Sequence, residues 1–148
     1  MTKREIGENY FFEGYNCAQS VALAFQEEIG LDKEIIVKLI SGFGGGFGRM
    51  REVCGAVSGM VFVLNAVCGY TSPTATTEKM ELYQKVQTLL NTFKNQNGSY
   101  ICRELLALPE QTSSPTPEAR TEGYYKKRPC KTLVGDACEI LENFLKTL

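Results

Sequence analysis

The stretch from Arg51 to Cys68 does most to limit the folds open to this chain. From Val53 to Cys68 only Ser58 and Asn65 interrupt an otherwise small or apolar run. A helix that is apolar around its whole circumference belongs in a protein interior, whereas a membrane span needs about 20 such residues. The sequence therefore predicts a central, buried helix over about residues 51–68 and no membrane span.

Most other segments carry apolar residues at helical spacing on one side, which is typical of helices packed around such a centre. Helices are predicted over residues 5–12, 16–30, 32–40 and 77–95, in a short segment that follows the cap candidate Ser99 through Cys102 and Leu106, and from Pro129 to the last apolar residues of the chain. Residues 108–124, which contain three prolines, are predicted to form a loop. No strand pattern of useful length is present. We expect an all-α fold, a single-domain helical bundle that comprises residues 1–148.

The net charge and the first residues of the chain indicate which partners and which compartment to expect. The net charge is −1, with both signs spread along the chain, so neither nucleic acid nor an anionic membrane is an expected partner. Residues 1–10 are polar and lack the apolar run of a signal peptide. We therefore expect a cytoplasmic protein. A redox partner protein of unknown identity is expected, and a homodimer is left open.

The absence of histidine and the number of cysteines indicate that cysteine carries the chemistry of this chain. The chain has no histidine, which excludes imidazole ligation, Ser-His and Cys-His catalysis, and the Cys-x-x-Cys-His haem attachment signal. It has six cysteines in 148 residues. Because structural disulfides are rare in the cytoplasm, such cysteine richness favours metal binding or thiol chemistry.

Four of the six cysteines fall at the predicted starts of helices: Cys17, Cys54, Cys102 and Cys130. Unpaired N–H groups and the helix dipole stabilise an anion at this end of a helix, and they lower the pKa of a cysteine there. The four are therefore predicted to share one site. Taken singly, each could instead be a small buried hydrophobic residue.

The remaining two cysteines are expected to lie outside this site. Cys68 is roughly 21 Å along the central helix from Cys54, and Cys138 is roughly 12 Å along the last helix from Cys130. Replacing either one is predicted to leave the shared site intact.

Two groups of glycines accompany the cysteines. The segment from Gly42 to Gly48 lacks the spacing of a nucleotide-binding motif, and it is predicted to be a mobile or tightly turned segment that brings N–H groups close to an anion. Gly55 and Gly59 give the central helix a face of small residues. This face is expected to let another helix, or a bulky inorganic group, approach closely.

These elements together resemble a known family. The segment Cys54-Gly55-Ala56-Val57-Ser58-Gly59 reads as CGAxxG. It is preceded by Asn16-Cys17-Ala18 and followed by Cys102-Arg103-Glu104-Leu105 and Pro129-Cys130. This order resembles the redox-active protein family labelled C_GCAxxG_C_C, over nearly the whole chain. The resemblance implies that Cys17, Cys54, Cys102 and Cys130 are the functional cysteines. A related domain, similar in pattern, occurs in split-Soret-type cytochromes together with an iron–sulfur centre.

Three functions are compatible with this pattern. The first is electron transfer through an iron–sulfur cluster held by the four thiolates, with Gly55 and Gly59 beside it and with Arg49, Arg51 and Arg103 as hydrogen-bond donors. The second is metal-free thiol–disulfide chemistry in which a low-pKa Cys54 or Cys17 attacks. The third is a structural zinc site with four cysteine ligands. The sequence does not decide between an oxidoreductase and an electron carrier.

Overall fold

The helix ends in the computed structural model follow the capping residues of the sequence. The structure describes residues 1–108 and 114–148. Helix α1 (Lys3–Glu13) begins after Thr2, which forms a capping box with Glu5, and it ends at Gly14 in the left-handed conformation. Helix α2 (Cys17–Ala24) begins after Asn16, which forms the same reciprocal cap with Gln19. In both cases the cap satisfies N–H groups that a helix start leaves unpaired.

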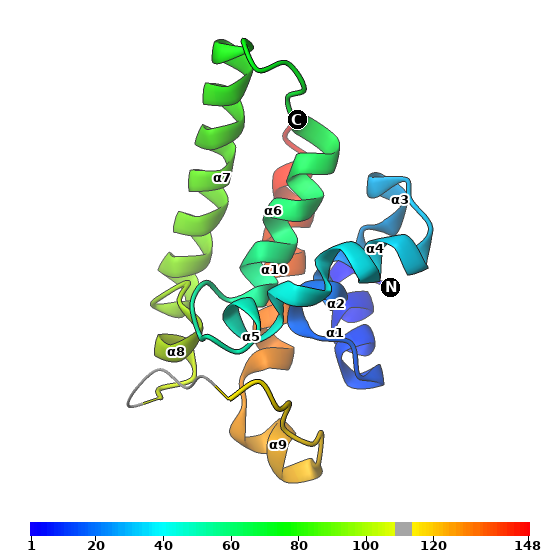
Figure 1. Ribbon diagram of the computed structural model, residues 1–148, viewed down its shortest axis with the longest axis vertical. Coiled ribbons are helices and arrows are strands. Elements are labelled where there is room, and N and C mark those ends of the chain that lie inside the picture. The colour runs from blue at the N-terminus through cyan, green and yellow to red at the C-terminus, as the bar shows by residue number, and fades with distance from the viewer. Residues whose placement is uncertain (109–113) are drawn as a thin grey trace.

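The other elements continue this helical pattern along the chain (Figure 1). They are α3 (Gln26–Ile29), α4 (Lys33–Ile40), the 3-10 turn η1 (Ser41–Phe43), α5 (Gly44–Phe47), α6 (Gly55–Cys68), α7 (Thr76–Asn97), α8 (Cys102–Leu105), α9 (Glu122–Lys127) and α10 (Cys130–Leu145). Within the described residues there is no strand, and the one β-bridge pairs Val53 with Ile101. The prediction of an all-α, single-domain helical bundle is confirmed.

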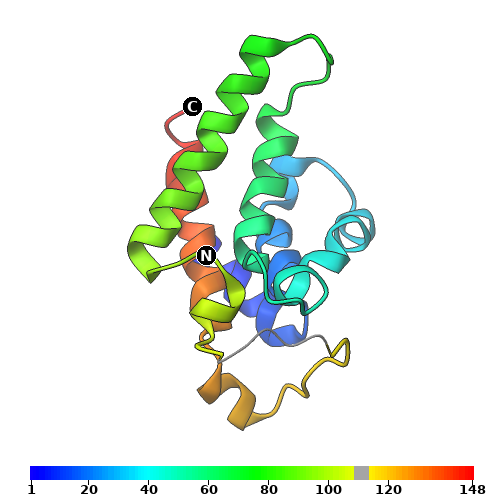
Figure 2. The same cartoon turned by 60° about the vertical axis from the view of Figure 1, so that its left-hand side comes forward.

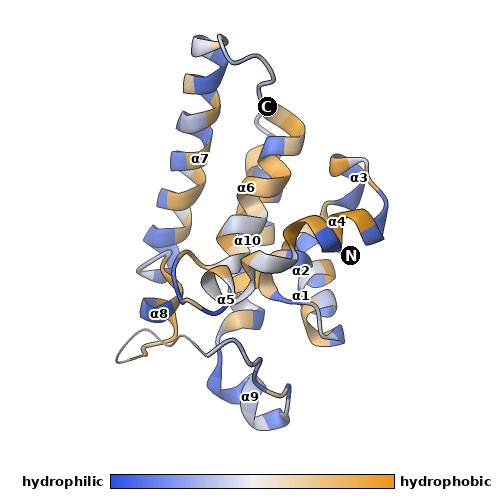
Figure 3. Ribbon diagram, in the orientation of Figure 1, coloured by the Kyte–Doolittle hydropathy of each residue, from blue (hydrophilic) through white to orange (hydrophobic). Residues whose placement is uncertain are grey.

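Helix α6 is the central element, and α2, α7 and α10 pack around it. Met60, Val63 and Leu64 are fully buried on it, and Figure 3 shows the helix as a largely apolar ribbon. The helix begins at Gly55 rather than at Arg51, because the backbone of Arg51 is left-handed (φ 63°) and residues 51–54 pair with residues 100–103. Its last turn is less enclosed, and Val67 is 44% exposed there. The predicted central helix is therefore confirmed, with a later start and an exposed end.

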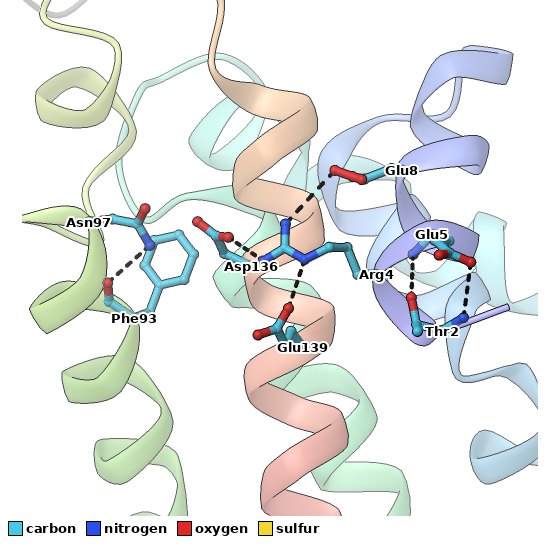
Figure 4. A network of polar contacts seen from close by, with 8 residues as sticks. All are labelled: Thr2, Arg4, Glu5, Glu8, Phe93, Asn97, Asp136 and Glu139. Atoms are coloured by element: carbon cyan, nitrogen blue, oxygen red, sulfur yellow. Dashed lines mark hydrogen bonds and ion pairs between the residues drawn. The ribbon is translucent and has the colours of Figure 1, made fainter.

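Helices α1 and α10 pack through small residues and an ion-pair network. The Sγ of Cys138 lies 2.5 Å from the position that a Cβ on Gly7 would take. Arg4 of α1 reaches across to Asp136 and Glu139 of α10, at 2.5 and 2.8 Å (Figure 4). The Asp136 and Glu139 carboxylates raise the pKa of Arg4. Cys138 is thus a buried packing residue of this helix interface.

The long helices define two ends of the molecule. In Figures 1 and 2, α6 and α7 run side by side with α10 next to them, and α6 and α7 are joined at the end farthest from α9. The starts of α6 and α10, together with α5 and α8, gather toward the opposite end. Among the described residues, no helix is both long and apolar enough to cross a membrane.

Two local features differ from the sequence prediction. The predicted helix from Asn16 to Gly30 is divided at Phe25, whose backbone leaves the helical region while its ring is buried. Helix α9 begins inside the predicted loop, where the Thr121 hydroxyl accepts a hydrogen bond from the N–H of Tyr124. The rest of the loop prediction concerns residues 114–121, which lie outside helices, and residues 109–113, which are outside the described part of the chain.

Candidate functional site

The starts of four helices, α2, α6, α8 and α10, meet around one cavity of about 370 Å³. Four cysteines line it: Cys17, Cys54, Cys102 and Cys130. Cys54 is the N-cap of α6, and each of the others is the first residue of its helix. Cys68 and Cys138 do not line this cavity. The structure thus places the cysteines in the two groups that the sequence predicted, while the role of the four remains a prediction.

A short extended pairing sets Cys54 beside Cys102. The N–H of Cys54 donates to the carbonyl of Tyr100 at 2.8 Å, and the N–H of Cys102 donates to the carbonyl of Glu52 at 2.6 Å. The bridge between Val53 and Ile101 lies between these two bonds. Two segments that are distant in sequence are therefore held in register immediately before α6 and α8, and both cysteines are fixed by backbone hydrogen bonds.

Gly55 and Gly59 both permit close approach to α2, although only Gly55 belongs to the cavity. A Cβ on Gly55 would overlap the Sγ of Cys17, and it would lie 3.1 Å from the carbonyl oxygen of Phe43. A Cβ on Gly59 would lie 2.8 Å from the Cβ of Val21 and 2.9 Å from the carbonyl oxygen of Ala18. Gly59 does not line the cavity. Gly55 therefore makes room for a cysteine, and Gly59 makes room for a neighbouring helix.

The glycine-rich segment closes one side of the cavity through an unusual run of left-handed backbone. Five consecutive residues, Gly45 to Arg49, have φ between 58° and 71°. Such a run is rare for side chains other than glycine, and here it includes Phe47 and Arg49. Gly44, Gly45 and Gly48 line the cavity. The segment is thus tightly turned beside the cysteines, as the sequence predicted.

The cavity carries more positive than negative charge. Arg49, Arg51, Arg120 and Arg128 line it, and the lining carboxylate of Glu118 pairs with Arg128 at 2.9 Å. The sequence pattern predicted Arg49 and Arg51 as hydrogen-bond donors at this site, but it did not predict Arg120 or Arg128. Arg103, the third arginine predicted there, donates to Glu52 and to the carbonyl of Arg51 and does not line the cavity.

Arg51 is the most deeply buried of these arginines. Only 7% of the residue is exposed. Its Nη1 lies 3.7 Å from the Sγ of Cys102, and its buried Nε has no hydrogen-bond partner among the described residues. Burying a charged donor without a partner is costly. This guanidinium would accordingly be stabilised by an anionic group in the cavity.

Burial has a larger effect than the helix start on the pKa of three thiols of this site. Burial raises the pKa of Cys54 well above its ordinary value, and the nearby Cys17 raises it further, although the N–H groups of Ala56 and Val57 oppose the shift. Burial also raises the pKa of Cys102 and takes that of Cys130 to about 12. The prediction of a low pKa for Cys54 is therefore wrong. Loss of water outweighs the two helix-end N–H groups.

This shift predicts a specific alkaline instability of the metal-free, reduced protein. The folded state holds the proton of Cys130 to about pH 12, whereas the unfolded chain releases it near 9.0. The stabilisation is fully present below that lower value and is lost as pH rises toward the higher one. Within this window Cys130→Ser should reduce the pH slope of the unfolding free energy by up to about 1.4 kcal/mol per pH unit. Urea unfolding at a series of pH values measures the slope.

The matched control for this experiment is Cys68→Ser, which removes a thiol that does not line the cavity. The pH slope of its unfolding free energy should be closer to the slope of the unmodified protein than the slope of Cys130→Ser is. Identical slopes for Cys130→Ser and the unmodified protein would show that the Cys130 thiol is not held protonated by the fold.

The cysteines surround the cavity and do not converge on a single point. Among residues 1–108 and 114–148, no three Cys, Asp or Glu side chains are grouped closely enough to hold one metal ion. Cys17 nevertheless acts electrostatically on the other three, since it contributes to the raised pKa of Cys54, Cys102 and Cys130. The arrangement is that of four sulfur donors around a shared space.

Sequence reasoning missed Tyr124, which also lines the cavity and lies in the first turns of α9. Burial raises the pKa of Tyr124 to about 12, with a further contribution from the neighbouring Cys130. The residue lies at the edge of a segment that reads as a loop. The one local signal is Thr121, which is a favourable helix cap three positions before it.

An all-helical protein with four cysteines around one cavity, each at the start of a different helix, belongs to the class of proteins with a cysteine-based site. Within that class, the sequence profile of the family described as "Putative redox-active protein (C_GCAxxG_C_C)" matches residues 15–144, and the chain belongs to this family. A search of curated proteins and a search of solved structures each gave no significant match.

Proposed function

We propose that this protein transfers electrons through an iron–sulfur cluster ligated by Cys17, Cys54, Cys102 and Cys130. The observation that carries the proposal is the cavity itself, which is lined by these four sulfur donors and by the buried Arg51, whose Nε has no hydrogen-bond partner among the described residues. Membership of a family described as redox-active agrees with it.

The residues of the cavity fit such a group in three respects. Four cysteine thiolates are the common ligand set of [2Fe–2S] and [4Fe–4S] clusters. Glycine stands at two places where a Cβ would crowd a lining cysteine: a Cβ on Gly55 would overlap Cys17, and one on Gly46, which itself does not line the cavity, would lie 2.8 Å from the Cβ of Cys102. The surplus of arginine matches the negative charge of a cluster with four thiolate ligands, and the orphaned Nε of Arg51 is an available donor.

When bound, the cluster would supply one-electron redox chemistry. The chain contributes the surroundings. Arg51 places positive charge against the Cys102 sulfur. Phe11, Leu105 and Leu133 give the cavity apolar walls that limit the access of water. Such walls, and hydrogen bonds to the sulfurs, are the levers by which a protein sets the potential of a cluster.

The two alternatives fit the cavity less well. A metal-free dithiol needs an ionised attacking sulfur, but burial raises the pKa of Cys54, Cys102 and Cys130. A zinc ion needs four sulfurs about 2.3 Å from one point, and the described side chains hold no such group. A polynuclear cluster spreads its attachment points over several metal ions, which suits donors placed around a cavity.

Protein produced and purified without air tests the proposal. We expect bound iron and acid-labile sulfide in comparable amounts, visible absorbance that is bleached by dithionite, and an electron paramagnetic resonance signal in one oxidation state. Stoichiometric zinc without sulfide would contradict the proposal and favour a structural site. Metal-free protein that cycles reversibly between dithiol and disulfide would favour the thiol alternative instead.

A further inference from the structure

Helix α4 has an exposed apolar stripe on its outer face. Its inner face carries Ile36 and Ile40, which are fully buried where α4 packs on α2. On the outer face, Ile35 is 45% exposed and Leu39 is 59% exposed. These two residues are four positions apart and are therefore neighbours on the helix surface. Three more large apolar side chains are exposed in the same part of the chain: Leu31, Phe47 and Met50. A group of this kind is typical of an interaction surface, whereas scattered single residues are not.

A charged stripe runs beside the apolar one. Glu34 and Lys38 each precede one of the two apolar residues by one position, so they lie about 100° around the helix from them. Both are exposed, and neither forms an ion pair with another described residue. In Figure 3, α4 carries both apolar and hydrophilic residues. The outer face of α4 therefore has one apolar edge and one charged edge.

The order of residues on this face is complementary to itself. When two such helices lie antiparallel about a two-fold axis that crosses them both, like edges face one another and the residue order is reversed in the second copy. The apolar edges then meet with Ile35 opposite Leu39 of the second copy. The charged edges meet with Glu34 opposite Lys38, so opposite charges are paired twice. A parallel arrangement would instead place the apolar edge of one copy against the charged edge of the other.

We propose that α4 is the contact surface of an antiparallel, two-fold homodimer of this protein. Ile35 and Leu39 form its apolar contact, and Glu34 and Lys38 form its rim. The occupant is a second copy rather than a different protein because the charged edge is complementary to itself. Helix α4 leads directly into Ser41, which lines the cysteine cavity. The dimer contact therefore adjoins the cavity wall in both copies, although it involves no cysteine and does not rest on the proposed function.

The size of this surface predicts a weak dimer. Helix α4 has eight residues and is therefore about 12 Å long. A standard interface takes about 800 Å² from each partner, and the whole surface of this chain is 8204 Å². One short helix supplies less area than a standard interface takes. We therefore expect a reversible equilibrium between monomer and dimer rather than a permanent dimer.

Sedimentation velocity of protein prepared without air, from micromolar to millimolar concentrations, tests the proposal. Exclusion of air also prevents dimers that are joined by a disulfide. We expect the average mass to rise from 16.4 kDa toward twice that value. Leu39→Ser should weaken the dimer roughly tenfold or more, because the apolar contact is lost in both copies. The matched control is Met80→Ser, which removes a side chain that is 53% exposed on α7 and should leave the equilibrium unchanged.

Charge reversal tests the antiparallel pairing. Glu34→Lys and Lys38→Glu each place like charges opposite one another at two symmetric contacts, and each should weaken the dimer roughly tenfold. The double variant Glu34→Lys/Lys38→Glu restores opposite charges at both contacts and should recover the dimer. Glu81→Lys on α7 makes the same change in net charge as Glu34→Lys and should have no effect. Circular dichroism confirms that each variant is folded.

Three results would overturn the proposal. The first is a monomer at every concentration, and the second is a dimer that none of the α4 variants weakens. The third is a double variant that associates no more tightly than the two single variants, because the antiparallel pairing requires recovery. None of these results depends on whether the protein binds a cluster.

Discussion

Cys54→Ala is expected to abolish most iron binding in protein prepared without air. Cys54 is nearly fully buried at the start of α6 and lines the cavity together with the three other cysteines. Groups that merely support a metal ligand change affinity by about 10–100-fold when they are mutated, so loss of a direct ligand should do at least as much. Iron and sulfide per chain, measured after desalting, give the result. The same loss is expected for Cys17→Ala, Cys102→Ala and Cys130→Ala.

Cys68→Ala provides the matched control, because Cys68 ends the same helix that Cys54 begins. It does not line the cavity and should retain full iron content. Cys138→Ala should also retain iron, although it leaves a small void against Gly7. Circular dichroism before desalting confirms that each variant is folded. A Cys54→Ala protein that is folded and still binds iron fully would remove Cys54 from the ligand set.

The helix framework could be predicted because its local signals agree with its tertiary packing. Asn16 and Pro129 stand directly before α2 and α10, and Gly14 and Gly30 follow α1 and α3 in the left-handed conformation. The gathering of four helix starts also followed from sequence, because cysteines at those positions share a chemical reason to be close.

The features that could not be predicted depend on packing between distant segments. Helix α9 is short, and its anchors are contacts of Tyr125 with Phe12 and of Arg120 with Phe11. Those partners lie more than 100 residues away in the sequence. The direction of the Cys54 pKa shift could likewise not be predicted from the sequence, because it depends on how completely neighbouring helices exclude water. A helix start lowers the pKa of an exposed cysteine, whereas deep burial reverses the outcome.

The glycine-rich segment shows how closely backbone and cavity are matched. The left-handed turn places Gly46 against the start of α8. A Cβ on Gly46 would lie 2.7 Å from the backbone nitrogen of Glu52 and 2.8 Å from the Cβ of Cys102. The Glu52 N–H also donates to the Gly46 carbonyl at 3.0 Å. Neither neighbour can easily withdraw, because Glu52 and Cys102 are themselves joined by a backbone hydrogen bond.

Gly46→Ala is therefore expected to lower the free energy of unfolding by about 2–5 kcal/mol. The left-handed backbone contributes about 1–2 kcal/mol, and overpacking contributes a further 1–3 kcal/mol or so. Gly30→Ala separates the two effects, because Gly30 has φ of 78°, nothing lies within 4 Å of its Cβ position, and it does not line the cavity. It should lose only the backbone part, about 1–2 kcal/mol. Urea unfolding of the two variants measures the difference.

The same pair of variants also tests the link between the turn and the cysteines. Because the new methyl group of Gly46→Ala would press on Cys102, this variant should lose iron even under conditions in which it remains folded. Gly30→Ala should retain iron, since its substituent points into open space away from the cavity. Equal stability and equal iron content in the two variants would show that Gly46 is needed for its backbone conformation alone and that its contact with Cys102 has no bearing on the site.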